Sequence, residues 1–377
     1  MKFEDFVSGV YRNQYQYKSF MPSKINQEWT WEDPRINVLL ERATQALGEL
    51  NAFSRIVPNV DLFIQMHILK EANTSSRIEG TRTEIDDVVK DAESIEPEKR
   101  DDWQEVRNYM KAMNEAIQHL DSLPLSLRLI RRTHEILMNN ARGEHKMPGA
   151  FRASQNWIGG SSLTDAAYIP PHVVDMPELL DDFEKFLHND SIQIPHLIRC
   201  ALAHYQFETI HPFLDGNGRI GRLLITLYLV SNKLLLKPTL YLSEYFELHR
   251  GQYYDALTRV RESNDIGHWV RLFLQAVVDT AEKGKITFDN ILSLHRNIEN
   301  DLVKLGRRAE NARRLLMHLY QSPAITVKQV EEVLGIQYYA ANMLINSLVE
   351  MEILVESTGY ARNRVFIFKR YVDTFIG

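Results

Sequence analysis

Cysteine is nearly absent from this sequence, with Cys200 the single example among 377 residues. One cysteine forms neither an intrachain disulfide framework nor a cysteine-based zinc site. The thirteen histidines include no H-E-x-x-H pattern, which excludes the zinc-peptidase arrangement. The longest apolar run, Leu223 to Val230, contains Thr226 and is too short to cross a bilayer. No signal-peptide pattern is visible at the start, so we expect a cytoplasmic protein with no membrane partner.

Neither sign of charge dominates. The 44 Lys and Arg residues face 50 Asp and Glu residues, giving a formal net charge of -6. This balance provides no global positive field that would attract nucleic acid. Binding to nucleic acid would therefore require a basic patch within one domain. The apolar share of 44% is ordinary for a folded globular chain. Because 377 residues exceed one compact core, we expect two or three domains.

Helical periodicity dominates the chain, and strand patterns are few. Leu197, Ala201 and Tyr205 share one helix face after the helix-opening Pro195. The expected helices lie near residues 36–50, 60–76, 102–120, 126–140, 174–188, 251–262 and 266–281. The segment 149–172 is rich in Gly, Ser and Asn and ends in two prolines, which predicts a hairpin or an exposed flap.

A second unit begins around residue 300. Three helical stretches and two short strands follow in the order typical of a winged helix-turn-helix. The expected helices are 307–320, 326–334 and 338–351, and the expected strands are 353–356 and 365–368.

The residues with the clearest chemistry form the sequence HPFLDGNGRIGR at positions 211–222. Its glycines permit a tight turn whose amides converge on an anion at the start of a helix. Arg219 and Arg222 are one turn apart, so both guanidinium groups can reach one polyphosphate. Asp215 is a hard oxygen ligand suited to Mg²⁺, and His211 can accept a proton at neutral pH. Together they predict nucleotidyl or phosphoryl transfer.

The same stretch matches, position for position, the HPFxDGNGRxxR signature of the Fic (Fic/Doc) family, which the chain resembles over about residues 1–300. Bacterial members with a C-terminal winged helix resemble the whole chain. The resemblance implies a mainly α fold: a Fic-type helical core with a β-hairpin flap, plus a C-terminal winged helix-turn-helix domain. The implied divisions are an N-terminal helical region with an inhibitory helix at 1–100, a Fic core at 101–300 and a winged-helix domain at 301–377.

The resemblance further implies a protein adenylyltransferase that uses ATP and Mg²⁺. His211 is then the catalytic base that deprotonates a Ser, Thr or Tyr hydroxyl of a target protein, and this hydroxyl attacks the α-phosphate. Asp215 holds the metal, and Arg222 pairs with the γ-phosphate. Nucleotide contacts are implied for Gly216, Asn217, Gly218, Arg219, Ile220, Gly221 and Arg222. We extend them to His249, where relatives commonly carry Asn.

Two more segments carry the resemblance. Residues 151–160 and 169–172 are similar to the family's hairpin that pairs with target backbone, and the target-docking residues are Trp157, Ile158, Gly159 and Gly160. Residues 74–80 match the inhibitory pattern (S/T)xxxE(G/N), with Ser75, Glu79 and Gly80 in the fixed positions. The resemblance implies that Glu79 pairs with Arg222 and excludes the productive γ-phosphate position.

Several alternatives stay open. Glu79 can instead position water for removal of AMP from modified proteins, or the fold can transfer another phosphate-containing group. A non-enzymatic alternative is a winged-helix regulator whose core senses ATP. The chain itself is among the open candidates for the substrate protein, and a homodimer is compatible with this architecture.

The partner of the winged helix is also open, between DNA and protein. The recognition-helix position has Tyr338, Tyr339 and Asn342 near its start but no Lys or Arg. Basic residues that can reach a DNA backbone follow in or after the wing: Arg362, Arg364, Lys369 and Arg370.

Overall fold

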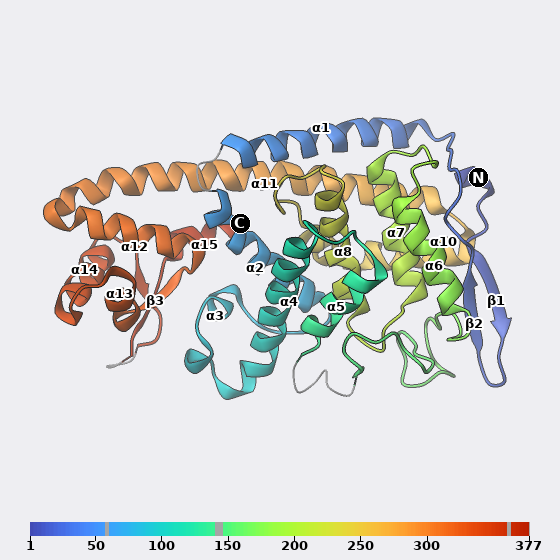
Figure 1. The fold of residues 1–377 in the computed structure, drawn as a ribbon, viewed down its shortest axis with the longest axis horizontal. Coiled ribbons are helices and arrows are strands. Elements are labelled where there is room, and N and C mark those ends of the chain that lie inside the picture. Colours follow the sequence, from blue (N-terminus) through green and yellow to red (C-terminus); the bar gives the residue numbers. More distant parts are fainter. Residues whose placement is uncertain (57–59, 140–145, 360–362, 377) are drawn as a thin grey trace.

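The computed structural model describes residues 1–56, 60–139, 146–359 and 363–376. Most of its elements are helices, which confirms the expected mainly α class. Helix α11 (Ile266–Leu302) runs along most of the molecule, and α1 (Pro34–Ile56) packs lengthwise against it (Figure 1). Among the described helices, none combines the length and the apolar character needed to span a membrane.

The prediction that a helix ends near residue 281 is wrong, because α11 continues to Leu302. Its second half keeps a buried stripe at helical spacing, formed by Phe288, Ile291, Leu294 and Ile298. This stripe stabilises the extension by burying apolar surface against neighbouring elements. Helix α1 likewise extends beyond the expected end at residue 50, whereas the other expected helices agree to within a few residues.

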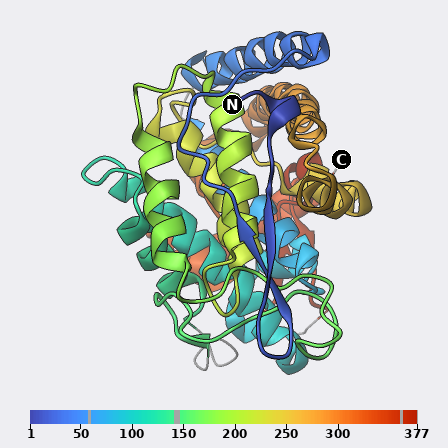
Figure 2. The ribbon, with the colours of Figure 1, turned by 90° about the vertical axis from the view of Figure 1, so that its right-hand side faces the viewer.

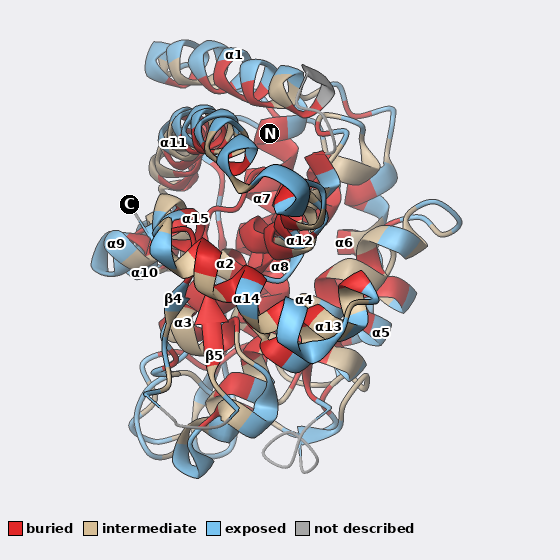
Figure 3. Cartoon of the chain, turned by 90° about the vertical axis from the view of Figure 1, so that its left-hand side faces the viewer, coloured by how far each residue is buried: buried red, intermediate tan, exposed pale blue. Residues whose placement is uncertain are grey.

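The helices that hold the 211–222 loop lie on one side of the α1–α11 pair (Figure 1). They are α2 (Val60–Ile78), α3 (Ile85–Val88), α4 (Arg100–His119), α5 (Leu127–Leu137), α6 (Met176–His188), α7 (His196–Ile210), α8 (Asn217–Ser231), α9 (Ser243–Leu248) and α10 (Arg250–Ser263). Nearly every residue of α7 and α8 is buried, which places this pair at the centre of the fold (Figure 3). The loop between them is therefore supported from several sides.

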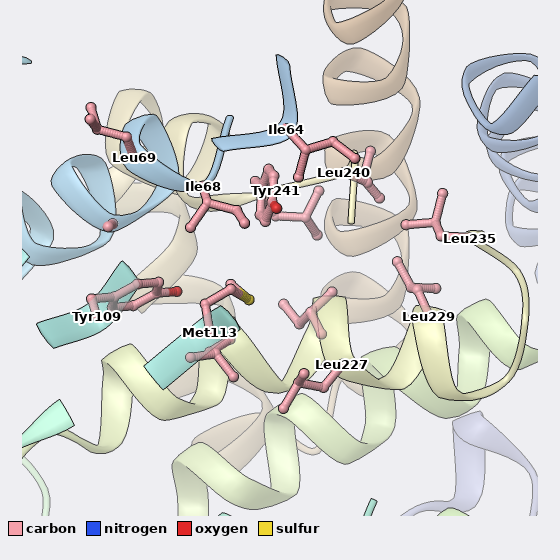
Figure 4. Close-up of a cluster of buried hydrophobic side chains, with 14 of the residues drawn as sticks. Ile64, Ile68, Leu69, Tyr109, Met113, Leu227, Leu229, Leu235, Leu240 and Tyr241 are labelled. Carbon is pink, nitrogen blue, oxygen red and sulfur yellow. The ribbon is translucent and has the colours of Figure 1, made fainter. Parts of the chain in front are cut away.

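One part of the apolar core joins α2 and α4 to the end of α8. Ile64 and Ile68 of α2 lie near Met113 of α4, Leu227 of α8 and Tyr241, all of them buried (Figure 4). The core therefore connects the helix that carries Ser75 with the helix that carries Arg222.

The C-terminal unit has the element order helix, strand, helix, helix, strand, strand, helix. Its three strands form an antiparallel sheet in the order β3-β5-β4. Thr326 and Gln329 form a capping box at the start of the second helix. The elements are α12 (Ala309–Gln321), β3 (Ala324–Thr326), α13 (Val327–Leu334), α14 (Tyr338–Glu350), β4 (Val355–Glu356), β5 (Val365–Ile367) and α15 (Lys369–Ile376). Strand β3 and helix α15 lie outside the elements expected from the sequence.

This unit packs directly on α2 and α3. The ring of Phe63 on α2 contacts Tyr320 with 5.0 Å between centroids, and His67 contacts Phe375 at 4.9 Å. Lys369 of α15 forms an ion pair of 2.8 Å with Asp86 of α3. The C-terminal unit thus contacts the chain both before and after Ser75 and Glu79.

An N-terminal hairpin, β1 (Gly9–Asn13) and β2 (Lys18–Pro22), lies beside the loops that follow α5 (Figure 2). The amide of Phe20 donates to the carbonyl of Ile169 at 2.9 Å, which ties this hairpin to the segment 149–172. In that segment the described pairing is one antiparallel bridge between Ile158 and Tyr168. The segment is therefore a loop closed by one bridge.

Candidate active site

His211 occupies a sharp reversal between α7 and α8. It caps the end of α7 in the left-handed conformation (φ 50°, ψ 61°), and Gly216 takes φ 75° just before α8 begins. Two side chains of the 149–172 segment hold this turn from outside: Arg152 Nε donates to the carbonyl of His211 at 3.1 Å, and Asn156 Nδ2 does so at 3.2 Å. Both are buried. Sequence reasoning placed both in the flap but did not predict their contact with His211, since nothing local indicates a contact across more than fifty residues.

The imidazole of His211 is suited to accept a proton. Burial lowers the pKa of His211 to about 4, so the ring is neutral at physiological pH. Its Nδ1 is buried, and an interaction of the ring with the backbone of Glu208, one helical turn earlier, acts against the effect of burial on the pKa. A neutral imidazole has an unprotonated ring nitrogen, which is the group that accepts the proton when histidine acts as a general base.

Asn217 shapes the loop from inside. Its Oδ1 accepts from the amide of Phe213 and its Nδ2 donates to the carbonyl of the same residue, each at 2.8 Å. The Asn217 side chain is thus engaged within the loop, and its contribution to a bound anion would come through its backbone amide. Ile220, also in the predicted contact set, buries its side chain in the core.

A histidine that sequence reasoning missed supports the Asp215 turn. Gly149 N–H donates to Nδ1 of His134 at 2.9 Å, which leaves the proton on Nε2 to be donated to the Asp215 carbonyl at 3.0 Å. The His134 ring stacks on Phe213 with 3.7 Å between centroids. Because burial lowers the pKa of His134 to about 4, this neutral arrangement persists at physiological pH.

Asp215 presents a half-exposed carboxylate beside Arg219. The amide of Gly216 donates to Asp215 Oδ1 at 2.6 Å, and Arg219 Nη2 lies 3.7 Å from the same oxygen. Arg219 itself forms a 3.0 Å ion pair with Glu105 of α4, a partner that the sequence did not indicate. Among the described residues no group of three or more His, Cys, Asp or Glu side chains forms a metal cluster. One exposed carboxylate nevertheless fits Mg²⁺, which takes most of its ligands from water and substrate phosphates.

Two of the three guanidinium nitrogens of Arg222 are engaged with the end of α2. Its Nε donates to Ser75 Oγ at 2.9 Å, and its Nη2 donates to the Ser75 carbonyl at 2.9 Å and to Glu79 Oε1 at 2.7 Å. Burial raises the pKa of Glu79, but the adjacent Arg222 outweighs this effect, so the pKa is lowered and Glu79 is ionised. Gly80 follows with φ 110°, a conformation that favours glycine, and turns the chain away after α2.

The carboxylate of Glu79 lies over the first turn of α8. A side-chain carbon built at Gly218 would lie 2.3 Å from Glu79 Oε1 and 3.0 Å from Arg222 Nη1. The absence of a side chain at Gly218 therefore allows an anionic group to approach this helix start closely. Helix N-termini stabilise anions, and here Glu79 occupies the position that suits a phosphate.

The predicted docking residues lie in the bridged loop. Trp157 is half-exposed, Ile158 pairs with Tyr168, and Gly159 and Gly160 take φ 68° and 70°. Tyr168 OH donates to the carbonyl of Thr209 at 2.7 Å, so the loop is anchored close to His211. The predicted role of these residues in docking stays a prediction.

His249 lies at the end of α9 and stacks on Tyr245, with 4.2 Å between centroids. Its Nδ1 is 2.9 Å from the Tyr245 carbonyl. Its nucleotide contact also stays a prediction.

Two family models match the chain: the Fic/DOC family N-terminal model over residues 38–118 and the Fic/DOC family model over residues 124–229. The protein adenylyltransferase Fic of Drosophila erecta is 34% identical over 139 residues, and that of Aedes aegypti is 33% identical. Each match covers 36% of this chain and 24% of the relative, so the chain spans about a quarter of the length of these curated relatives.

Solved structures show the same fold. A Fic family protein from Desulfovibrio desulfuricans G20 superposes with a TM-score of 0.57 at 21% identity, covering 90% of this chain and 98% of that one. Fic-1 from C. elegans gives a TM-score of 0.51 at 19% identity, covering 70% and 75%. The family model includes the whole 211–222 loop, and this chain belongs to the Fic/DOC family.

Proposed function

We propose that this chain is a protein adenylyltransferase, which transfers AMP from ATP to a Ser, Thr or Tyr hydroxyl of a protein. The observation that carries the proposal is His211: a neutral imidazole held in a left-handed turn beside the start of α8, among the groups of the 211–222 loop. The names of the curated relatives support the same activity.

In the proposed reaction the triphosphate of ATP lies at the N-terminus of α8. The amides from Gly216 to Gly221 and the guanidinium of Arg219 stabilise its negative charge. Asp215 would hold Mg²⁺, which when bound supplies charge neutralisation at the phosphates. His211 takes the proton of the target hydroxyl as its oxygen forms a bond to the α-phosphorus, the bond to the β-phosphate oxygen breaks, and pyrophosphate leaves.

We also propose that Glu79 inhibits this reaction. Its carboxylate lies over Gly218 and pairs with Arg222, the side chain assigned to the γ-phosphate. A carboxylate and a phosphate compete for the same guanidinium, so productive ATP binding requires Glu79 to withdraw. Removal of AMP, with Glu79 positioning water, remains the alternative for this site.

The loop 149–172 serves as the proposed docking flap for the target. Its anchoring by Arg152 and Asn156 to the His211 carbonyl would bring an extended target segment close to the catalytic base. Trp157 is exposed and adjoins Ile158, which forms the bridge to Tyr168. Target backbone pairing along the loop would accept many sequences.

We propose that the C-terminal unit is a winged helix-turn-helix that binds a protein. Its order of elements supports the fold. Tyr338, Tyr339 and Met343 are exposed on α14, the recognition-helix position. Lys369 is engaged by Asp86 and Asp373, and Arg364 donates to Asn342, which weakens the case for DNA. Arg362, also assigned to DNA contact, lies outside the described residues.

The decisive experiment labels the chain with α- or γ-labelled ATP and Mg²⁺, first alone and then with lysate proteins. We expect α label on Glu79→Gly, weak label on wild type and no label on His211→Ala. Glu352→Gly is the matched control, because Glu352 also follows a helix but is far from the loop in sequence and is exposed. Gamma label would indicate phosphorylation. Label on His211→Ala equal to that on Glu79→Gly would refute the assignment of the base, and lack of label on every variant would favour AMP removal or ATP sensing.

A further inference from the structure

Glu208 is a buried carboxylate that the proposed reaction does not use. It lies on α7 one helical turn before His211 and is 7% exposed. Its Oε1 has no hydrogen-bond partner within the part of the chain that the structure describes. A buried carboxylate without such a partner is unfavourable, so a role that involves its charge is expected.

Glu208 is directed at the helix that carries Arg222. A side-chain carbon built at Gly221 would lie 2.0 Å from Glu208 Oε1. The carboxylate thus occupies the space that any larger residue at Gly221 would fill. Gly218, over which Glu79 lies, is on the same face of α8 one turn earlier, so the carboxylates of Glu79 and Glu208 approach neighbouring positions of one helix.

Arg222 is the charge that both carboxylates face. Burial lowers the pKa of Arg222, and Glu79, Tyr253 and Glu208 more than offset this effect, so the pKa is raised. Its Nη1 is buried and has no hydrogen-bond partner in the described residues. The guanidinium therefore has a donor left over after Ser75 and Glu79 are satisfied.

Withdrawal of Glu79 would leave Arg222 without its ionic hydrogen bond. An unpaired buried cation is strongly unfavourable, so Arg222 would leave its position unless another carboxylate replaced Glu79. Glu71 is also buried nearby, but it already accepts hydrogen bonds from Tyr109 and Ser243. Glu208 is the uncommitted carboxylate.

We propose that Glu208 is a positioning residue that holds Arg222 in place when Glu79 withdraws, so that the guanidinium stays ready for the γ-phosphate. This inference rests on the proposed inhibitory role of Glu79. Arg222 has one counter-ion in each state: Glu79 in the inhibited state and Glu208 in the open one.

The electrostatics of Glu208 agree with such an exchange. Burial raises the pKa of Glu208 to about 7, Arg222 and Arg261 lower it, and Glu79 raises it. Tyr253 of α10 also faces this carboxylate. Removal of the Glu79 charge therefore lowers the pKa of Glu208 and favours the ionised form that Arg222 then requires.

The test is a double-mutant cycle on the melting temperature of the full chain, with Glu79→Gly, Glu208→Gln and the double variant. We expect the melting temperature of the double variant to fall by more than the sum of the decreases in the two single variants. The reason is that Arg222 lacks an ionic partner only in the double variant. Addition of ATP should raise the melting temperature of the double variant by more than it raises that of either single variant. Glu208→Asp in the Glu79→Gly background keeps the charge and should recover part of the loss.

Asp182→Asn provides the matched control, since Asp182 is a buried carboxylate that accepts from the Ile25 amide, away from this group. When Asp182→Asn is combined with Glu79→Gly, the two decreases in melting temperature should add. In labelling assays the double variant should show at least a tenfold higher KM for ATP than Glu79→Gly. An additive cycle for Glu208 would overturn this proposal and leave the inhibitory role of Glu79 intact. A Glu79→Gly variant no more active than wild type would refute inhibition, while a coupled cycle would still show that Glu79 and Glu208 both stabilise Arg222.

Discussion

The free energy of unfolding should depend on pH through Glu208, and Glu208→Gln isolates this dependence. Burial raises the pKa of Glu208 from an ordinary 4.5 to about 7. A difference of about 2.5 in pKa corresponds to about 3 kcal/mol of differential stability. The sign follows from proton binding: between pH 4.5 and 7 the unfolded chain has released this proton while the folded chain retains it. Rising pH therefore favours unfolding through this window.

The measurement is urea unfolding of wild type and Glu208→Gln at pH values from 4.5 to 8, followed by tryptophan fluorescence. Trp269 reports on the relevant region, because it is buried and stacks on His204 of α7. Relative to Glu208→Gln, wild type should lose about 3 kcal/mol between pH 4.5 and 7 and no more above pH 7. Contributions of the buried histidines cancel in this difference. A difference independent of pH would refute the reasoning, since it would mean that Glu208 ionises normally in the folded protein.

Two further substitutions test the packing around the site. Gly221→Ala should destabilise the protein by about 1–3 kcal/mol in urea unfolding, because the new carbon meets Glu208 Oε1, and Glu208→Ala should remove most of that effect. If Gly221→Ala destabilised the wild-type chain and the Glu208→Ala variant equally, the close approach of Glu208 Oε1 to Gly221 would be contradicted. Phe375→Ala should cost about 3–5 kcal/mol and increase α labelling of the otherwise wild-type chain, because it loosens the C-terminal unit from His67 on α2. Ile376→Ala, a substitution at the exposed neighbouring residue, should change neither the free energy of unfolding nor the α labelling. Unchanged labelling of Phe375→Ala would show that the C-terminal unit does not contribute to inhibition.

Local patterns predicted much of the helical framework. Helices α7 and α8 and the turn between them follow from apolar spacing interrupted by glycines, so the place of His211 at a helix end was predictable. The hairpin β1–β2 was missed, because its strands are short and the first is largely exposed, which leaves little alternation of apolar and polar residues. The extension of α11 was missed for the opposite reason: its buried stripe is regular but is separated from the first half by the polar stretch near Lys283.

Sequence by itself determined the chemistry offered by the 211–222 loop, because base, carboxylate, glycines and arginines lie within one short segment. Only the tertiary structure decided how these groups are held. Glu105 reaches Arg219, His134 supports Asp215, and Glu208 lies against Gly221. Such contacts join distant segments, and their residue types are individually ordinary. Burial then turns them into strong interactions, since removal from water makes each charge depend on its nearest partner.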